Sequence, residues 1–400
     1  MRTRQVRAIA LTLMLTGTLL GACSSGGGSS RTIEVDSNFD EFAGTFRAFF
    51  PRDVTVKPGM TLKFHQKWSG EPHTVTMGKE VQDRIEPEML PLILRSTSKE
   101  PSDDEQFSDE VNAAVEKFFG ELPFFFGEKG PNPPVAQPCY LKTGLPEEGK
   151  ACPKQAQPAF AGTESYFNSG FIPYEGTSGN EFEMKIADDA KPGTYFYYCA
   201  LHGAGMSGQI KVTKSGAVPS QASLNKQARK EIAEVAKPLL AGLKKEQAGN
   251  GAIKGNLAGS GDESLNGVKG QVNEFTPRTV RAKVNETVKW SFISNHSISF
   301  NVPPYIPIYK VKSGKVTGND KVYEPAGGWP GRPEPTAEDE GPPVPSVDVD
   351  AGKFDGSGGL KSSGVDWQTG DTYSVTFTKP GTYPMACLIH PGMIGKVVVS

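Results

Sequence analysis

The chain contains an internal duplication, which constrains its fold more than any other feature. Residues 192–212 read PGTYFYYCALHGAGMSGQIKV, and residues 380–399 read PGTYPMACLIHPGMIGKVVV. With one gap in the second copy, Pro, Gly, Thr, Tyr, Cys, His, Gly, Met and Gly coincide. Upstream, residues 54–64 resemble residues 280–290, and a histidine follows each of these stretches. A duplication of this kind predicts two homologous domains.

Each copy shows the alternation of apolar and polar side chains that is typical of β-strands. The alternating apolar residues are Val54, Val56, Leu62, Phe64, Val284, Val288, Trp290, Tyr373, Val375 and Phe377. Turn residues interrupt these runs, with Pro58-Gly59 in the first copy and Asn285-Glu286 in the second. Short strands with such turns and little helix predict an all-β fold, a sandwich or a barrel in each domain.

The segment between the copies predicts a partly helical linker over residues 215–270. Apolar residues recur at near-helical spacing within 219–248, and a Gly/Asn/Ser-rich run follows up to Gly270. Pro238 should kink or break this helix, because proline lacks the amide proton that a helix interior needs. We therefore expect a helical connector followed by a flexible stretch.

The domain boundaries follow from the repeats. We expect a first domain over 31–214 with an insertion at about 79–165, and a second over 271–400 with an insertion at about 303–365. The first insertion holds the apolar run 122–126, which could be a partner surface. Such a run more often packs against its own domain, and we favour that interpretation.

The first residues predict export. Arg2, Arg4 and Arg7 precede an apolar stretch that is too short to span a bilayer comfortably. The stretch ends in Leu20-Gly21-Ala22-Cys23, which resembles a bacterial lipoprotein signal. The resemblance implies a signal peptide over 1–22, a lipidated Cys23 and a Gly/Ser tether over 23–30; a plain secretory signal is the alternative. Both place the chain outside the cytoplasm, with lipidation anchoring it to the outer face of the cytoplasmic membrane, in the periplasm or at the cell surface.

The composition excludes one large class of partners. The formal net charge is −2 and the sequence contains no basic tract, so nucleic-acid binding is not expected. Apolar residues make up 36%, against 46 glycines and 32 prolines, which indicates long loops around modest cores.

The five cysteines divide into three groups. Cys23 belongs to the expected lipid anchor. Cys139 and Cys152 lie together in the first insertion, and the default in an exported protein is that they form a disulfide. Cys199 and Cys387 occupy equivalent positions in the two repeats. Two unpaired thiols in an exported protein need a reason, and a metal ligand is the obvious one.

Four of the five histidines also fall at equivalent positions. Each repeat thus offers two histidines, one cysteine and one methionine: His73, Cys199, His202 and Met206 in the first, and His296, Cys387, His390 and Met393 in the second. Two imidazoles, a thiolate and a weak thioether suit copper, and the soft sulfur ligands stabilise Cu(I). His65 is the remaining histidine, and we interpret it as a solvated or capping residue.

The spacings Cys-x2-His-x3-Met and Cys-x2-His-x2-Met resemble those of the cupredoxins, the blue copper proteins that include plastocyanin and amicyanin. The resemblance covers residues 45–78, 180–213, 272–302 and 366–400. It implies two Greek-key β-sandwiches, a type 1 copper in each, and His202 and His390 near the surface as electron ports. The first loop is one residue shorter than that of plastocyanin, which puts the axial role of Met206 in doubt.

The expected function is single-electron transfer between a redox donor and an acceptor, without enzymatic activity. Oxidases and nitrite reductases built from such repeats need further histidines, and only His65 is spare. The alternatives are a copper storage or delivery protein and a non-redox scaffold module. No His- or Met-rich tract supports delivery, and two intact ligand sets argue against a scaffold.

Overall fold

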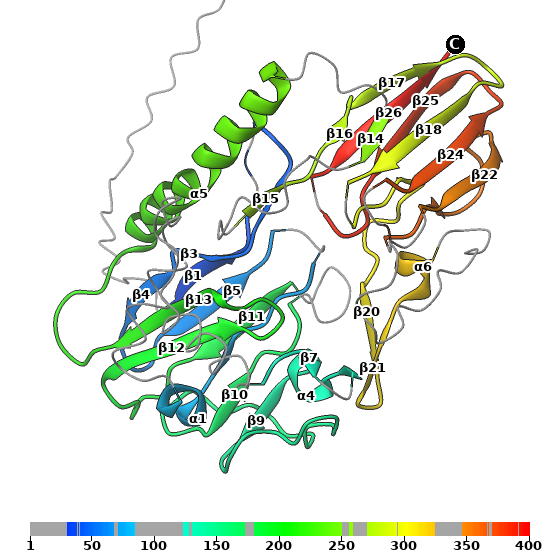
Figure 1. Cartoon of the computed structure of the whole chain (residues 1–400). Coiled ribbons are helices and arrows are strands. Elements are labelled where there is room, and N and C mark those ends of the chain that lie inside the picture. The colour runs from blue at the N-terminus through cyan, green and yellow to red at the C-terminus, as the bar shows by residue number, and fades with distance from the viewer. Residues whose placement is uncertain are drawn as a thin grey trace, which may run out of the picture.

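The structure, a computed structural model, places two β-domains side by side with one long helix packed against the first (Figure 1). It describes residues 30–37, 39, 41–67, 71–84, 123–127, 130–172, 180–249, 256–258, 270–293, 295–324, 346–365, 367, 370–390 and 392–400. The expected signal peptide and Cys23 lie outside these residues. No helix in the described part of the chain is both long and apolar enough to span a bilayer.

The first domain consists of two sheets. One has the order β11 (Glu181–Lys185), β5 (Thr61–His65), β1 (Ser30–Val35) and β3 (Phe49–Phe50). The other has the order β4 (Asp53–Val56), β13 (Gly203–Val212), β12 (Gly193–Cys199), β6 (Thr76–Met77), β10 (Tyr166–Asn168) and β9 (Cys139–Leu141). Buried residues alternate with half-buried ones along β1 and β5. The buried apolar residues of both strands belong to one core between the two sheets.

The second domain repeats most of this arrangement, but its two sheets have five strands each, where those of the first domain have four and six. Its first sheet has the order β16 (Phe275–Thr276), β14 (Asn256–Ala258), β18 (Thr287–Phe292), β24 (Thr372–Phe377) and β22 (Asp348–Phe354). Its second has the order β17 (Thr279–Ala282), β26 (Ile394–Val399), β25 (Gly381–Ala386), β19 (Ser299–Phe300) and β23 (Lys361–Ser362). The all-β sandwich predicted for both domains is confirmed.

Equivalent side chains fill the two cores. Phe64 on β5 and Trp290 on β18 are both fully buried, each in its own hydrophobic cluster. Val284 is the exception among the alternating residues, since 36% of its surface is exposed. It lies at the turn before β18, where Asn285 adopts a positive φ of 65°. The alternation of buried and exposed residues therefore begins only after this turn, within β18.

The linker differs from its prediction in two respects. Helix α5 (Gln221–Gly249) continues through Pro238 without a break. The apolar face of α5, including Leu239, packs against Phe46 and Val272, and this burial compensates for the hydrogen bond that the proline removes. The stretch expected to be flexible supplies β14, which pairs in parallel with β18 as β1 pairs with β5.

The insertions also contribute to the sheets. β9 and β10 pair at the edge of the first domain, and β22 pairs in parallel with β24 in the second. Short helices complete them: α1 (Lys79–Asp83), α4 (Pro133–Ala136) and α6 (Asp320–Tyr323). A small hairpin joins β7 (Phe126–Gly127) to β8 (Gly130–Pro131).

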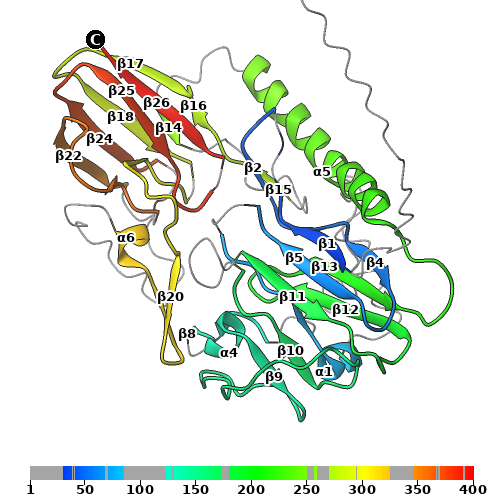
Figure 2. The ribbon, with the colours of Figure 1, turned by 180° about the vertical axis from the view of Figure 1, so that it is seen from behind.

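In the part of the chain that the structure describes, the two domains are joined at two places (Figure 2). Strand β2 (Gly44–Phe46) of the first domain pairs with β15 (Gly270–Val272), which leads into the second. A hairpin of the second insertion, β20 (Tyr309–Lys312) and β21 (Lys315–Gly318), packs on the first domain. The buried Phe125 of the apolar run therefore contacts both Phe171 of its own domain, as expected, and Tyr309 of the other.

Candidate metal centres

The first centre, site 1, forms where β12 ends. Cys199 is the last residue of β12, and the backbone amide of His202 donates to its carbonyl oxygen across the tight turn into β13. Gly203 closes this turn with a φ of 65°, a conformation that disfavours other residues. His73 is fixed by reciprocal backbone hydrogen bonds with Ile172 of 3.0 and 2.7 Å. Three distant segments thus meet at one point.

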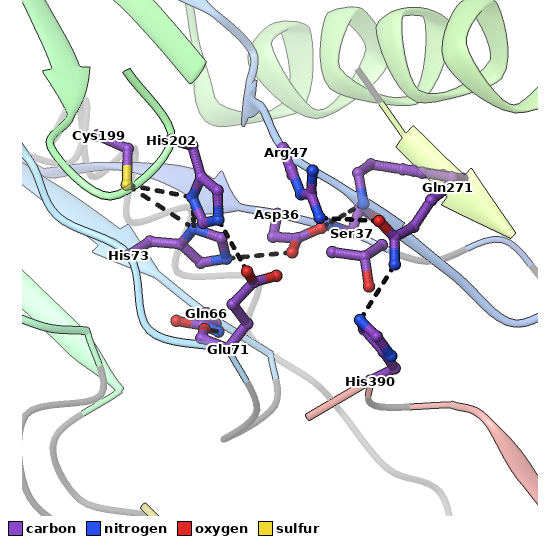
Figure 3. Close-up of polar contacts among 12 residues, drawn as sticks. Asp36, Ser37, Arg47, Gln66, Glu71, His73, Cys199, His202, Gln271 and His390 are labelled. Atoms are coloured by element: carbon purple, nitrogen blue, oxygen red, sulfur yellow. Dashed lines mark hydrogen bonds and ion pairs between the residues drawn. The ribbon is translucent and has the colours of Figure 1, made fainter. Parts of the chain in front are cut away.

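The donor atoms of site 1 face one another. The Nδ1 atoms of His73 and His202 lie 3.1 Å apart, and the Cys199 Sγ lies 3.9 and 3.4 Å from them (Figure 3). Site 2 has the same geometry. The Nδ1 atoms of His296 and His390 are 2.9 Å apart, and the Cys387 Sγ is 3.6 Å from that of His390. In each group all three ligand atoms lie within 4.8 Å of one another.

The partners of the outer ring nitrogens favour a cation at site 1. His73 Nε2 is 3.1 Å from Asp36 Oδ2, and His202 Nε2 is 2.8 Å from Glu71 Oε1. A carboxylate accepts hydrogen bonds, so each imidazole holds a proton on Nε2 and turns Nδ1 inward. Two Nδ1 atoms and a sulfur then point at one another, and they can bind a metal once the Nδ1 atoms are deprotonated.

Asp36 and Glu71 are held in place by their own contacts. Asp36 Oδ1 accepts from the backbone amides of Ser37 and Phe46 at 2.5 and 2.6 Å. The buried Gln66 donates to the carbonyl oxygen of Glu71 at 2.7 Å and fixes the end of that loop. Neither carboxylate was identified from the sequence, because neither belongs to a spaced motif.

Both sulfurs also accept a backbone hydrogen bond. The amide of Thr74 points at Cys199 Sγ and that of Ser297 at Cys387 Sγ, both at 3.3 Å. The two hydroxyls in turn accept from the residues that follow the cysteines, at 2.8 Å each. Sequence reasoning missed this pair, although a hydroxyl residue directly follows each of the two distant histidines.

Electrostatics favours thiolates at both centres. Burial opposes charge on Cys199, but His202 and His73 bring the pKa of its thiol well below the usual value. Burial acts on Cys387 in the same way, and His390 and His296 lower its pKa. Burial alone would lower the pKa of His73, yet Asp36 and Cys199 raise it to about 10. Each sulfur thus lies in surroundings that stabilise its anion, the form that binds metals.

The second centre differs at its outer edge. The Nε2 of His390 lies 3.0 Å from Nε2 of Gln271, whose Oε1 accepts from Arg47 at 2.8 Å. An imidazole that binds a metal through Nδ1 carries its proton on Nε2, so Gln271 must then present its amide oxygen to His390. Only 5% of the surface of His390 is exposed. The expected surface position of His390 is therefore wrong, because β15 covers its outer nitrogen.

The remaining predicted residues fall in three places. Met206 and Met393 are fully buried beside the two turns, Met206 on β13 and Met393 just before β26. His65 ends β5 between Glu34 and Glu181 and belongs to neither donor group. Cys139 and Cys152 form a disulfide, with Cα atoms 5.6 Å apart.

A cavity of about 390 Å³ lies between the domains, next to both centres. Its lining includes Arg47, Glu71 and His202 from the first domain, and Tyr309, Tyr323 and Ile389 from the second. The side chain of His202 is 10% exposed, so its ring edge is only slightly accessible.

Comparisons with known proteins give weak similarities. No family model matches the chain, and no curated protein matches it. An amicyanin variant in its Cu(I) form is 20% identical over 31% of this chain and 70% of that one, with a TM-score of 0.17. A purple cupredoxin from Nitrosopumilus maritimus is 17% identical over 36% and 97%, with a TM-score of 0.16. At TM-scores this far below 0.5, these similarities establish neither a family nor a function.

Proposed function

We propose that this chain is an exported, membrane-anchored blue copper protein that transfers single electrons between redox partners. The main support is the repeated donor set, with two imidazoles and a thiolate at site 1 and the same at site 2. Bound copper would supply a one-electron couple at each site. Cys23 would provide the lipid anchor, and the partners would be a redox donor and a redox acceptor protein.

The residues present fit copper better than other common metals. A His-Cys-His set with a buried methionine nearby matches the trigonal, thiolate-containing sites that copper occupies. Backbone hydrogen bonds from Thr74 and Ser297 hold the two sulfurs in place. Because the ligands come from rigid strands and tight turns, they would move little between Cu(II) and Cu(I). Little movement favours electron transfer.

Voltammetry of the copper-loaded chain tests this function against storage or delivery. An electron carrier gives two reversible one-electron waves and loses copper slowly to a soluble chelator. The variants Cys199→Ser and Cys387→Ser should each remove one wave and leave the other. Irreversible waves together with rapid copper loss would instead support delivery.

A further inference from the structure

Given the copper sites proposed above, we propose that the two sites form an internal electron relay, with site 1 as the donor and site 2 as the acceptor. The relay would run across the domain interface and end at the contact between Gln271 and His390. Two features of the structure support it: a continuous chain of contacts, and a difference in charge between the two sites.

The chain of contacts begins at His73. Its Nε2 bonds Asp36, and the other oxygen of Asp36 accepts from the amide of Phe46 at 2.6 Å. The next residue, Arg47, donates to Gln271 at 2.8 Å, and Gln271 contacts His390 at 3.0 Å (Figure 3). Two hydrogen bonds, the backbone and side chain from Phe46 to the Arg47 guanidinium, and two close polar contacts of Gln271 therefore connect a ligand of site 1 to a ligand of site 2.

The contact between Gln271 and His390 is well packed, and Gln271 has further defined partners. Gln271 is 7% exposed and also donates to Asn273 at 2.8 Å. Asn273 is fully buried and donates to Thr45 on β2 at 2.9 Å. Pairing of β2 with β15 fixes both segments, so Gln271 is held against His390 by the same contacts that join the domains.

The charges set the direction. With a metal on Nδ1, one proton remains for His73 and Asp36 together, so this pair carries one negative charge. His202 and Glu71 form a second such pair. The partner of His390 is a neutral amide, so site 2 has at most one such pair. Arg47, which contacts Gln271, lies between the sites and acts on both.

Negative charge next to a ligand stabilises the oxidised ion more than the reduced one, since Cu(II) carries the larger positive charge. Site 1 should therefore have the lower reduction potential. With copper held by His73, Cys199 and His202 at site 1 and by His296, Cys387 and His390 at site 2, one electron would pass from Cu(I) at site 1 to Cu(II) at site 2, so that one ion is oxidised and the other reduced. No proton moves and no bond forms or breaks.

The test uses the full copper-loaded chain and one equivalent of a small-molecule reductant. EPR of the half-reduced protein should show mainly the Cu(II) signal of site 1. The variants Cys387→Ser and Cys199→Ser give the reference spectra of site 1 alone and of site 2 alone. We expect the site 1 signal to exceed the site 2 signal at least tenfold. The half-reduced protein is poised midway between the two potentials, so a tenfold excess corresponds to a difference of about 118 mV, twice the 59 mV of a tenfold one-electron equilibrium. Equal signals or the reverse order would overturn the relay.

Charge removal tests the cause of the difference. Glu71→Gln and Asp36→Asn should each raise the potential of site 1 and leave that of site 2 unchanged. Two variants are used because Asp36 is fully buried and its substitution could impair folding. If neither variant shifts site 1, charge does not set the direction and the proposal fails.

The route is tested by the rate of internal equilibration after a radical reductant delivers one electron. Gln271→Ala should slow this rate at least tenfold when the rates are compared at the difference in potential that voltammetry gives for the same variant. Gln221→Ala is the matched control, because Gln221 makes similar hydrogen bonds to Thr32, away from both sites. An unchanged rate in Gln271→Ala would contradict the route. If the unaltered copper-loaded chain showed neither blue copper site, the proposed function itself would be contradicted.

Discussion

At the scale of single residues, the partners of the ligands distinguish the two centres more than the ligands do. Both centres share the histidines, the cysteine and a backbone donor to sulfur. They differ at the outer imidazole nitrogens, where site 1 has Asp36 and Glu71 and His390 of site 2 has Gln271. The ligand set determines which metal binds, and these partners adjust its properties.

The methionines provide a prediction at this scale. Met206→Leu and Met393→Leu should each keep two coppers per chain and raise the potential of the altered site. Leucine fills the same volume without donating, and the loss of one donor atom destabilises Cu(II) more than Cu(I), which tolerates fewer ligands. Voltammetry of each variant measures the shift.

The unaltered site in each of these variants is the internal control. A wave that does not move in Met206→Leu would show that Met206 is not an axial ligand, which is the doubt raised by its shorter loop. Loss of copper would show that the methionine is required for binding.

At the scale of elements, the first insertion is tied to its domain by the edge strands β9 and β10. Cys139 at the start of β9 forms its disulfide with Cys152, at a sequence separation of 13. In the chain-entropy model a loop of this size contributes about 3 kcal/mol. The bridge should therefore stabilise the first domain and have no effect on the second.

The double variant Cys139→Ala/Cys152→Ala should lower the free energy of unfolding of the first domain by about 3 kcal/mol. Urea unfolding in a Cys387→Ser background measures this, because only site 1 then absorbs in the visible range. The same double variant in a Cys199→Ser background reports on the second domain and should show no change. An equal loss in both backgrounds would contradict the assignment of the bridge to one domain.

At the scale of the whole molecule, two unlike contacts fix the domains: the ladder between β2 and β15 under α5, and the hairpin β20–β21 on the first domain. The ladder requires a glycine at position 270. A Cβ there would lie 2.8 Å from Phe46 and 2.9 Å from Leu239 of α5. The interface thus depends on the close approach of these side chains to the backbone of Gly270.

Gly270→Val should loosen the domain arrangement and leave both copper sites intact. Small-angle scattering should show a larger radius of gyration, and internal electron equilibration should become slower. Gly359→Val is the matched control, since nothing lies within 4 Å of a Cβ added at Gly359. Scattering identical to that of the unaltered chain would show that the ladder does not hold the domains.

The repeat made the fold and the two clusters of histidine and cysteine predictable, because strand alternation and loop spacing are local properties of the sequence. Asp36 and Glu71 could not be predicted, since they reach the site from loops without a spaced motif. Gln271 reaches His390 only through pairing between the domains, which no local pattern indicates.

Tertiary packing also overrode two local signals. Pro238 does not end α5, because the helix buries an apolar face against β-strands that precede and follow it in the chain. The Gly-rich stretch after α5 contributes β14, whose backbone pairs with β18 and β16. In both cases, tertiary contacts outweighed weak local propensity.

Copper content per chain, measured together with visible and EPR spectra, tests the central claim most directly. We predict two coppers per chain and intense thiolate-to-copper absorption, halved in Cys199→Ser and in Cys387→Ser. A chain that binds no copper, or binds it without that absorption, would contradict the assignment of both centres.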